Sequence, residues 1–301
     1  GFKMIYTVTF NPAIDYVIGL NQFNIGEVNR ASKEQIFFGG KGINVSWILN
    51  TLNVDSIALG FVAGFTGEAI EKGVSAQGIK TDFVFLDNGF SRINVKMKSS
   101  KETEINGQGP QINEDDIQKL FTKLDNLKSG DTLVLAGSIP NTLPSDMYEK
   151  ILKHLSNKGI YFVVDATKDL LVNVLKYKPF LIKPNNHELA EIFNVELKSN
   201  DDIVTYAKKL QDMGARNVLI SMAGDGCILI DEFGKVYTMG VPYGQVINSV
   251  GDSMVAGFIA GYSQTHDYEY ALRLGTASGS ATAFSEGLAE KSKIDKLLQQ
   301  L

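Results

Sequence analysis

What this 301-residue sequence lacks excludes several classes of protein. Its single cysteine, Cys227, rules out a disulfide within the chain. Its three histidines, His154, His187 and His266, lie far apart and show none of the spacings typical of zinc ligands. No apolar run reaches the roughly 18 residues that a membrane span requires, and no Gly-x-x-x-x-Gly-Lys-Ser/Thr phosphate loop occurs.

An excess of positive charge is also missing. Lys and Arg number 29 against 34 Asp and Glu, which gives a formal net charge of -5 and a pI of about 5.4. This balance argues against binding to nucleic acid, although it allows a small basic pocket for a phosphorylated metabolite. The N-terminus shows no charged-then-apolar signal pattern, so we expect a cytoplasmic protein that binds no membrane.

Strand and helix patterns alternate along most of the chain. The predicted strands are β-branched or apolar runs between turn residues: 4–10, 56–62, 132–136, 160–164, 180–183, 218–222, 226–230 and 236–239. The predicted helices have apolar residues at helical spacing: 42–52, 66–77, 144–157, 167–175, 186–193, 200–213 and 251–263. The alternation predicts an α/β fold, with a parallel central sheet between two layers of helices. Residues 13–38 and 81–106 break this rhythm, and we expect them to form a small second sheet.

An aspartate follows a glycine at the start of the last predicted helix. The first N–H groups of a helix have no partner within it and the helix dipole is positive there, so this end attracts anions. Asp252, next to Gly251, could deprotonate a hydroxyl while the turn holds a phosphoryl group. An ordinary helix cap formed by Ser249 or Asp252 is an equally good interpretation of these residues alone.

A second glycine-rich turn, Gly39-Gly40-Lys41-Gly42, opens the first predicted helix. Glycines let the backbone approach a ligand closely, and Lys41 supplies a point charge suited to phosphate. The alternative is a flexible turn with a solvated lysine. No Gly-x-Gly-x-x-Gly motif follows the first strand, which disfavours a nicotinamide dehydrogenase.

Other strand ends carry polar groups that suit sugar or nucleotide binding. Asp15 could accept hydrogen bonds from sugar hydroxyls, although the preceding Asn-Pro also fits a simple turn. Asn185 and Glu188 are spaced either to orient Mg²⁺ through its waters or to cap a helix. Small residues at 221–226 suit either the approach of a nucleotide or a tight turn. Several such loops in one α/β chain predict a site in the crevice at the strand ends.

Taken together, these motifs resemble those of the ribokinase-like sugar kinases of the phosphofructokinase-B family. Asn-Pro-Ala-x-Asp, Gly-Gly-Lys-Gly-Ile-Asn, Gly-Ser-Ile-Pro, Lys-Pro-Asn-x-x-Glu and Gly-Asp-Ser stand in the family's order, from Met4 onward. The resemblance implies a Rossmann-like three-layer α/β/α sandwich, a single domain over 4–301, with a β-sheet lid from 13–38 and 81–106. It also implies ATP, Mg²⁺, in-line phosphoryl transfer to a sugar-phosphate hydroxyl and a homodimer formed through the lid.

The same resemblance implies roles for individual residues. Asp252 would be the catalytic base, Gly251 part of the anion hole, and Glu188 a residue that acts on Mg²⁺ through water. The residues implied in sugar-phosphate binding are Asp15, Gly39, Gly40, Lys41, Asn44, Arg30, Arg92 and Ser138. Those implied in nucleotide binding are Lys183, Asn185, Ser221, Gly224 and Gly226.

Within the family, residues 103–110 are most similar to the branch that phosphorylates fructose 1-phosphate to fructose 1,6-bisphosphate, and the tagatose 6-phosphate branch is close. The family's anion hole usually reads Gly-Ala-Gly-Asp or Gly-Ser-Gly-Asp, and this chain is two residues shorter before Asp252. We favour two residues missing from the sequence as read, because both flanks match the family. A true deletion would remove backbone donors worth about 10²–10³ in rate each, and would favour a non-catalytic sugar-phosphate sensor.

Overall fold

The structure, a computed structural model, describes residues 3–242, 251–285 and 287–301. Ser249 and Val250, which belong to the shortened anion-hole segment, lie outside these ranges. Gly251 is the first residue of a helix, and Asp252 is the second.

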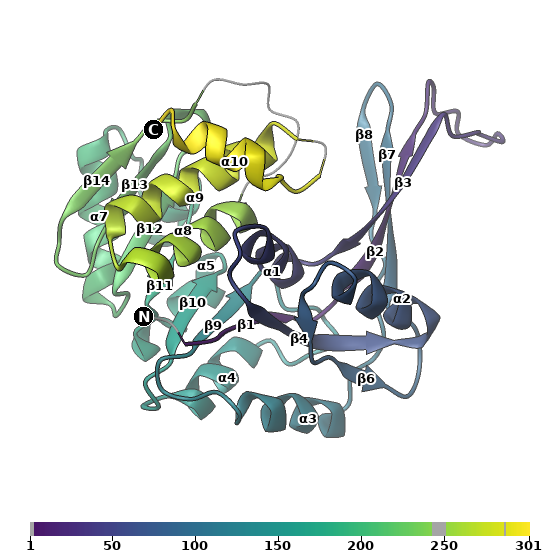
Figure 1. The fold of residues 1–301 in the computed structure, drawn as a ribbon, viewed down its shortest axis with the longest axis horizontal. Coiled ribbons are helices and arrows are strands. Elements are labelled where there is room, and N and C mark those ends of the chain that lie inside the picture. The colour runs from purple at the N-terminus through teal and green to yellow at the C-terminus, as the bar shows by residue number, and fades with distance from the viewer. Residues whose placement is uncertain (1–2, 243–250, 286) are drawn as a thin grey trace.

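Within these ranges, ten strands form the central sheet, in the order β14-β13-β12-β11-β10-β9-β1-β4-β5 with β6 paired to β4 (Figure 1). Their bounds are β1 Ile5–Thr9, β4 Ser56–Ala63, β5 Lys80–Thr81, β6 Val84–Leu86, β9 Thr132–Ala136, β10 Tyr161–Asp165, β11 Leu181–Ile182, β12 Asn217–Ser221, β13 Cys227–Ile230 and β14 Val236–Met239. All pairs are parallel except those of the edge hairpin, β12 with β13 and β13 with β14.

Helices cover both faces of this sheet. One face carries α1 Lys41–Thr51, α2 Gly64–Ser75, α8 Gly251–Thr265, α9 Tyr268–Ala283 and α10 Lys291–Leu298. The other carries α3 Glu114–Leu124, α4 Met147–Leu155, α5 Lys168–Val172, α6 Asn186–Phe193 and α7 Asn200–Asp212. The predicted α/β/α sandwich is thus confirmed, and α3, α9 and α10 add to the helices that the pattern predicted.

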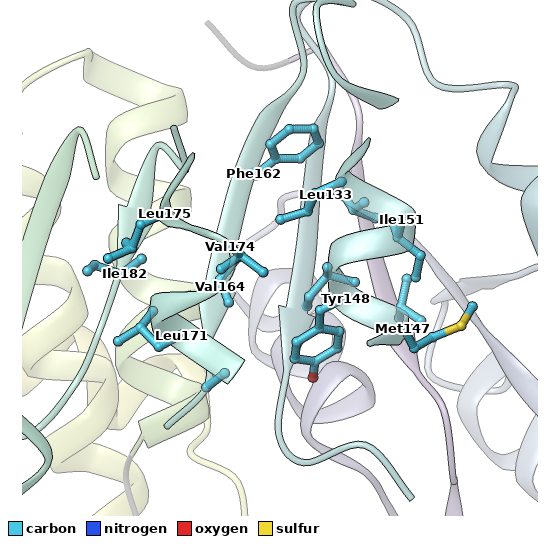
Figure 2. Packing of buried hydrophobic residues seen from close by; sticks show 14 of the residues in the cluster. Leu133, Met147, Tyr148, Ile151, Phe162, Val164, Leu171, Val174, Leu175 and Ile182 are labelled. Carbon is cyan, nitrogen blue, oxygen red and sulfur yellow. The ribbon is translucent and has the colours of Figure 1, made fainter. Parts of the chain in front are cut away.

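The apolar core between the sheet and the second helix layer also fixes a loop at the strand ends. Figure 2 shows Tyr148 and Ile151 of α4 beside Leu133 of β9, with their apolar parts turned toward the sheet. The buried Tyr148 hydroxyl donates a 2.7 Å hydrogen bond to the carbonyl oxygen of Gly137, directly after β9. Burial raises the pKa of this phenol, so it remains a donor at neutral pH. Core packing therefore extends to the loop that carries Ser138.

A separate four-stranded sheet projects from the main body (Figure 1). It consists of β2 Ala13–Gly19, β3 Lys33–Gly39, β7 Arg92–Lys98 and β8 Glu102–Ile105, in the order β3-β2-β7-β8. β2 and β7 pair in parallel, and the other two pairs are antiparallel. Its strands come from the two segments that interrupt the strand–helix alternation. We call this element the projecting sheet.

The strand order creates one crevice in the central sheet. The chain passes from β1 to β4 and β5 on one side, then returns to build β9, β10, β11 and β12 on the other. The connections that leave the carboxyl ends of β1 and β9 therefore diverge. In open α/β sheets, ligands bind at such a reversal of strand order.

Candidate active site

Two adjoining cavities lie at the carboxyl ends of β1 and β9 and under the base of the projecting sheet. One, of about 360 Å³, is lined in part by Thr9, Gly40, Lys41, Arg92, Gly137 and Ser138. The other, of about 250 Å³, is lined in part by Asp15, Gly40, Lys41, Asn44, Arg92 and Asn94. Because Gly40, Lys41 and Arg92 line both, the two cavities adjoin, and together they gather most of the predicted sugar-phosphate residues.

The Asp252 carboxylate lies against helix α1 at the edge of these cavities. Its Oδ2 accepts a 3.2 Å hydrogen bond from Asn44 Nδ2, and its Oδ1 lies 3.7 Å from Lys41 Nζ. Oδ1 is buried and has no hydrogen-bond partner among the described residues. Burial raises the pKa of this carboxyl, whereas Lys41 and Asn44 lower it. A buried carboxylate with one free oxygen is suited to accept a proton from a bound hydroxyl.

Further charged groups come from neighbouring strand ends. Asp165 ends β10, and its Oδ1 lies 3.8 Å from Nζ of Lys183, which follows β11. Burial raises the pKa of the nearby Glu188 carboxyl, which Lys183 lowers and Asp165 raises. Asp252 and, less strongly, Asp165 raise the pKa of the Lys41 ammonium against the opposing effect of burial. Three carboxylates thus interact with two ammonium groups, a balance that suits a bound cation.

Asp15 enters the cavities from the projecting sheet. A side chain at Gly39 would place its Cβ 2.2 Å from Asp15 Oδ2, so only glycine leaves room for this carboxylate. Asn94 donates a 3.2 Å hydrogen bond to Asp15 Oδ1, and Lys96 Nζ lies 3.8 Å from Oδ2. Burial still leaves the pKa of Asp15 raised overall. The carboxylate is therefore held in a fixed orientation toward the cavity, where sugar hydroxyls would be its natural partners.

Arg92 is positioned by the turn that follows β1. Its Nε donates a 3.0 Å hydrogen bond to the carbonyl oxygen of Asn11, and the Asn11 amide donates in turn to the carbonyl oxygen of Gln108. Burial lowers the pKa of the Arg92 guanidinium, which remains charged at neutral pH because arginine loses its proton only at very high pH. Since Nε is already used, the terminal nitrogens are the groups available to an anion in the cavity.

The predicted nucleotide residues lie at the next strand ends. Asn185 caps helix α6 by accepting the Glu188 N–H at 2.8 Å, and it pairs across an isolated parallel bridge with Ser221 at the end of β12. The cap interpretation of the Asn-x-x-Glu spacing is confirmed for Asn185, and a hydrogen bond from the Asn185 backbone also lowers the pKa of the Glu188 carboxyl. Lys183, Asn185 and Ser221 therefore occupy one edge of the sheet, beside the Asp252 cluster.

The two predicted glycines after β12 differ in their surroundings. Gly224 is exposed, and a Cβ added there would meet nothing within 4 Å. Gly226 has a φ of +92°, and a Cβ there would lie 2.0 Å from the carbonyl oxygen of Met239. Gly226 is thus required by the turn into β13, while Gly224 presents open backbone. Ala223 has a φ of 48°, which is uncommon for any residue other than glycine.

Comparisons with known proteins decide the family. The sequence model described as pfkB family carbohydrate kinase matches residues 8–295. The chain belongs to this PfkB family. The kinase is 47% identical over 300 residues to the 1-phosphofructokinase of Bacillus subtilis, a match that covers 99% of this chain and 98% of that protein. It is 37% identical to the D-tagatose-1-phosphate kinase of Bacillus licheniformis, over 99% of this chain and 98% of the relative.

A solved structure agrees with this assignment. The crystal structure of a putative phosphofructokinase from Staphylococcus aureus has a TM-score of 0.89 and 44% identity to the kinase, covering 98% of this chain and 97% of that one. The ribokinase-like α/β/α sandwich expected from the sequence motifs is therefore the fold of this PfkB kinase. No helix within the described ranges is long and apolar enough to cross a membrane.

One predicted substrate residue of the kinase lies elsewhere. Arg30 is exposed in the connection after β2, beyond the end of the hairpin where Gly19 pairs with Lys33. The base of that hairpin, where Ala13 pairs with Gly39, is six residues away, roughly 20 Å at about 3.4 Å per residue. A single chain therefore does not bring Arg30 to the cavities, because the length of the hairpin separates them.

Sequence reasoning missed four residues that the fold adds to this site: Thr9, Asn94, Lys96 and Asp165. Asp165 is a lone acidic residue at the end of an apolar strand, and this position is the only feature of the sequence that could have marked it as a site residue. Asn94 and Lys96 lie on β7, whose pairing with β2 brings them to Asp15. Thr9 resembles any β-branched residue of a buried strand. None of these belongs to a motif, so their roles depend on tertiary structure.

A further groove, of about 480 Å³, lies between α3 and α4. Phe121, Met147 and His154 are among its lining residues, and none of the predicted site residues reaches it. It contains no glycine-rich backbone and no cluster of lysines with buried carboxylates. On chemical grounds the strand-end cavities are therefore the better candidate for the active site.

Proposed function

We propose that this PfkB kinase transfers the γ-phosphoryl group of ATP to the C6 hydroxyl of fructose 1-phosphate, giving fructose 1,6-bisphosphate. The observation that carries the proposal is the Asp252 carboxylate, which is buried, lies 3.7 Å from Lys41 and has its Oδ1 free of hydrogen bonds among the described residues. A structural aspartate would satisfy both oxygens, because an unpaired buried acceptor is costly. A free oxygen next to a substrate-sized cavity fits a base that awaits a hydroxyl.

In this proposal Asp252 accepts the proton as the substrate oxygen attacks the γ-phosphorus. The bond from that phosphorus to the ADP oxygen breaks, and ADP leaves with the electron pair. The raised pKa of Asp252 suits this step, since a base works best when its pKa approaches the working pH. Gly251, at the first turn of α8, would contribute backbone N–H to the developing charge.

Cationic side chains would neutralise the phosphates on both sides of Asp252. Lys41, with Arg92, lines the cavity assigned to the sugar phosphate, whereas Lys183 lies toward the nucleotide strand ends. Phosphoryl transfer depends mainly on positioning and charge neutralisation, so this set of groups is chemically sufficient. Asp15, Asn44, Gly40 and Ser138, with Gly39 from an adjacent cavity that Asp15 and Asn44 also line, would bind the sugar. Asn185, Ser221 and Gly224 would contact ATP.

The donor set also fits Mg²⁺. Within the described ranges no group of three or more His, Cys, Asp or Glu could hold a metal on its own. Mg²⁺ in kinases is usually bound by one or two carboxylates together with substrate phosphates and water. Asp165 and Glu188 would supply those carboxylates, since their negative charges repel each other and Asp165 raises the pKa of Glu188. Mg²⁺ bound there would neutralise charge on the nucleotide phosphates.

The choice of fructose 1-phosphate rests on the relatives. The Bacillus subtilis 1-phosphofructokinase is 47% identical, against 37% for the D-tagatose-1-phosphate kinase. Tagatose phosphates remain the second candidate substrates, and tagatose 6-phosphate is the one that the sequence motifs suggest. Fructose and tagatose differ in the configuration of one hydroxyl, and tagatose 6-phosphate also carries its phosphate at the other end of the sugar. The contacts of Asp15 and Asn94 with the hydroxyls, together with the position of the phosphate site, would decide between the two substrates.

We further propose that the projecting sheet serves as a lid and pairs with the same sheet of a second chain. Its strands expose apolar side chains, and by their register Ile36, Ile93 and Ile105 lie on the same face of the sheet. Exposed apolar patches on a sheet face are typical of interfaces. Such pairing would also bring Arg30, at the far end of one lid, within reach of a site other than its own.

The test is the identity of the product. Incubation of the kinase with Mg-ATP and fructose 1-phosphate, followed by ³¹P NMR, should give ADP and a sugar with two phosphomonoester signals of equal area. Fructose 6-phosphate serves as the control sugar for the position of the existing phosphate. ADP formation without a bisphosphate would identify ATP hydrolysis and contradict the proposal.

A further inference from the structure

Helix α1 begins without a capping side chain of its own. Its N-cap residue is Gly40, with φ 133° and ψ 138°, and no side chain within the motif caps the helix. Ser, Thr, Asp or Asn normally occupies this position and accepts the N–H of the second or third helical residue. The helix ladder starts with Asn44 N–H bonded to the Gly40 carbonyl oxygen. The N–H groups before Asn44 therefore need partners from outside the helix.

Thr9, the last residue of β1, supplies one of those partners. Its Oγ1 accepts the N–H of Ile43 at 2.9 Å, which is the bond that an N-cap side chain would make. The two residues are 34 positions apart, and this bond is buried. Lys41, the first residue of the helix, lines the same cavity as Thr9 and Gly40, so this end of the helix adjoins the cavity.

Three glycines enclose Thr9. A Cβ at Gly40 would lie 2.4 Å from Thr9 Cγ2, one at Gly42 would lie 2.6 Å from Thr9 Oγ1, and one at Gly60 would lie 2.1 Å from the Thr9 carbonyl oxygen. Heavy atoms cannot approach so closely, so each position is closed to a side chain. The glycine-rich motif therefore brings the helix end against Thr9 as well as opening the backbone to a ligand.

We infer that Thr9 is a positioning residue that sets the anion-binding end of α1 at the junction of β1 and β9, and so sets the affinity for the sugar phosphate. The inference rests on the proposed function for the identity of that ligand. Capping from β1 satisfies the innermost N–H of the helix without placing a side chain over the outer ones. A capping side chain at position 40 would collide with Thr9, because its Cβ would lie 2.4 Å from Thr9 Cγ2.

The test compares two threonines of the same strand. Thr9→Val keeps the shape and removes the acceptor, whereas Thr9→Ser keeps the hydroxyl. Thr7→Val is the matched control, because Thr7 Oγ1 also bonds from β1 to α1, reaching Ser46 Oγ at 2.7 Å in the middle of the helix. Ser46 keeps its second partner, Ser56, in that control. Both valine variants lose one buried hydroxyl, and only Thr9→Val affects the helix end.

We expect Thr9→Val to raise KM for fructose 1-phosphate roughly tenfold, about the effect of one hydrogen bond, with KM for ATP nearly unchanged. Thr9→Ser should restore KM, and Thr7→Val should leave it as in the wild type. The inference would be overturned if Thr9→Val raised KM for fructose 1-phosphate and KM for ATP equally, or if Thr7→Val raised KM for fructose 1-phosphate as much as Thr9→Val does. Either result would mean that the loss of a hydroxyl destabilises α1 as a whole. If Thr9→Val is insoluble, Thr9→Ala removes the same hydroxyl.

Binding of inorganic phosphate separates this inference from the proposed function. Titration calorimetry of the wild type, Thr9→Val and Thr7→Val measures the Kd for inorganic phosphate at the helix end without any turnover. Weaker phosphate binding in Thr9→Val alone supports the inference even if no sugar phosphate is phosphorylated, and equal affinities in all three contradict it. Failure of the wild type to phosphorylate fructose 1-phosphate overturns the proposed function and leaves this comparison valid.

Discussion

The Asn44 amide donates a 3.2 Å hydrogen bond to Oδ2 of Asp252, across 208 positions of sequence. The bond joins helix α1, which follows the glycine-rich turn, to the first turn of α8. It occupies one carboxylate oxygen, whereas the other, Oδ1, lies beside Lys41 and has no hydrogen-bond partner within 3–242, 251–285 and 287–301. The geometry thus gives the two oxygens different tasks, one to orient the carboxylate and one to take a proton.

Replacing this base should abolish turnover and spare binding. Asp252→Asn keeps the size of the side chain and removes its basicity, so kcat should fall by about 10²–10⁴, the usual contribution of a general base. The Kd for fructose 1-phosphate, measured by calorimetry, should change little. Asp231→Asn, at a buried hairpin carboxylate of the opposite sheet region, is the control and should keep kcat. Near-normal kcat in Asp252→Asn would remove Asp252 from the role of base.

The pH dependence of the kinase should follow the partners of Asp252. Asn44 and Lys41 lower the pKa of this carboxyl, so removing the amide in Asn44→Leu raises it further. The base acts only when ionised, and activity is therefore lost as the pH falls through its pKa. The acidic limb of the kcat profile at saturating substrate should move to higher pH in the variant. A limb that stays in place or moves to lower pH would contradict this assignment.

Glu188 should determine the Mg²⁺ concentration that the kinase requires for activity. Glu188→Gln keeps the backbone N–H that Asn185 caps, so helix α6 remains capped while one carboxylate is lost. The free Mg²⁺ concentration for half-maximal rate should rise several-fold, because Mg²⁺ relies on few carboxylates. Glu191→Gln removes the same charge from the same helix, where Glu191 pairs with Lys168 at 3.4 Å, and should leave the Mg²⁺ requirement unchanged. Equal shifts in both variants would point to a general charge effect.

Pairing of the projecting sheets should depend on their apolar face. Ile36 on β3 is 61% exposed, and a glutamate there would bring charge into the proposed interface. Ile36→Glu should convert a dimer to a monomer in sedimentation velocity at micromolar concentration. Phe233→Glu places the same charge at an 83% exposed position of the β13–β14 hairpin and should leave the dimer intact. A wild-type monomer would contradict the proposed assembly.

The sequence alone predicted the fold class and the edge of the sheet that carries the site. Glycine, proline and charged residues follow β1, β9, β11 and β12, and the carboxyl ends of parallel strands share one edge. The sequence did not predict helix α9, because it consists largely of small residues that are buried almost throughout and so shows no alternation of apolar and polar faces. A helix surrounded by protein lacks the polar stripe that periodicity detects.

Two positions show what motifs alone could not provide. Arg30 was predicted to bind substrate, yet the register of β2 and β3 places it at the far end of a long hairpin. Thr9 was not predicted, because its hydroxyl acquires a role only when β1 and α1 pack together. Distances along a strand and contacts between distant segments are properties of the folded chain. Neither can be read from residue types at fixed spacing.

The most direct measurement is ADP release with Mg-ATP and each of fructose 1-phosphate, tagatose 6-phosphate and fructose 6-phosphate at equal concentration. Fructose 1-phosphate should give the highest kcat/KM, and the rate should disappear in Asp252→Asn. A preference for tagatose 6-phosphate would retain the mechanism and contradict the substrate assignment. No turnover of any of the three by folded wild-type protein would contradict the central claim and favour a sugar-phosphate sensor.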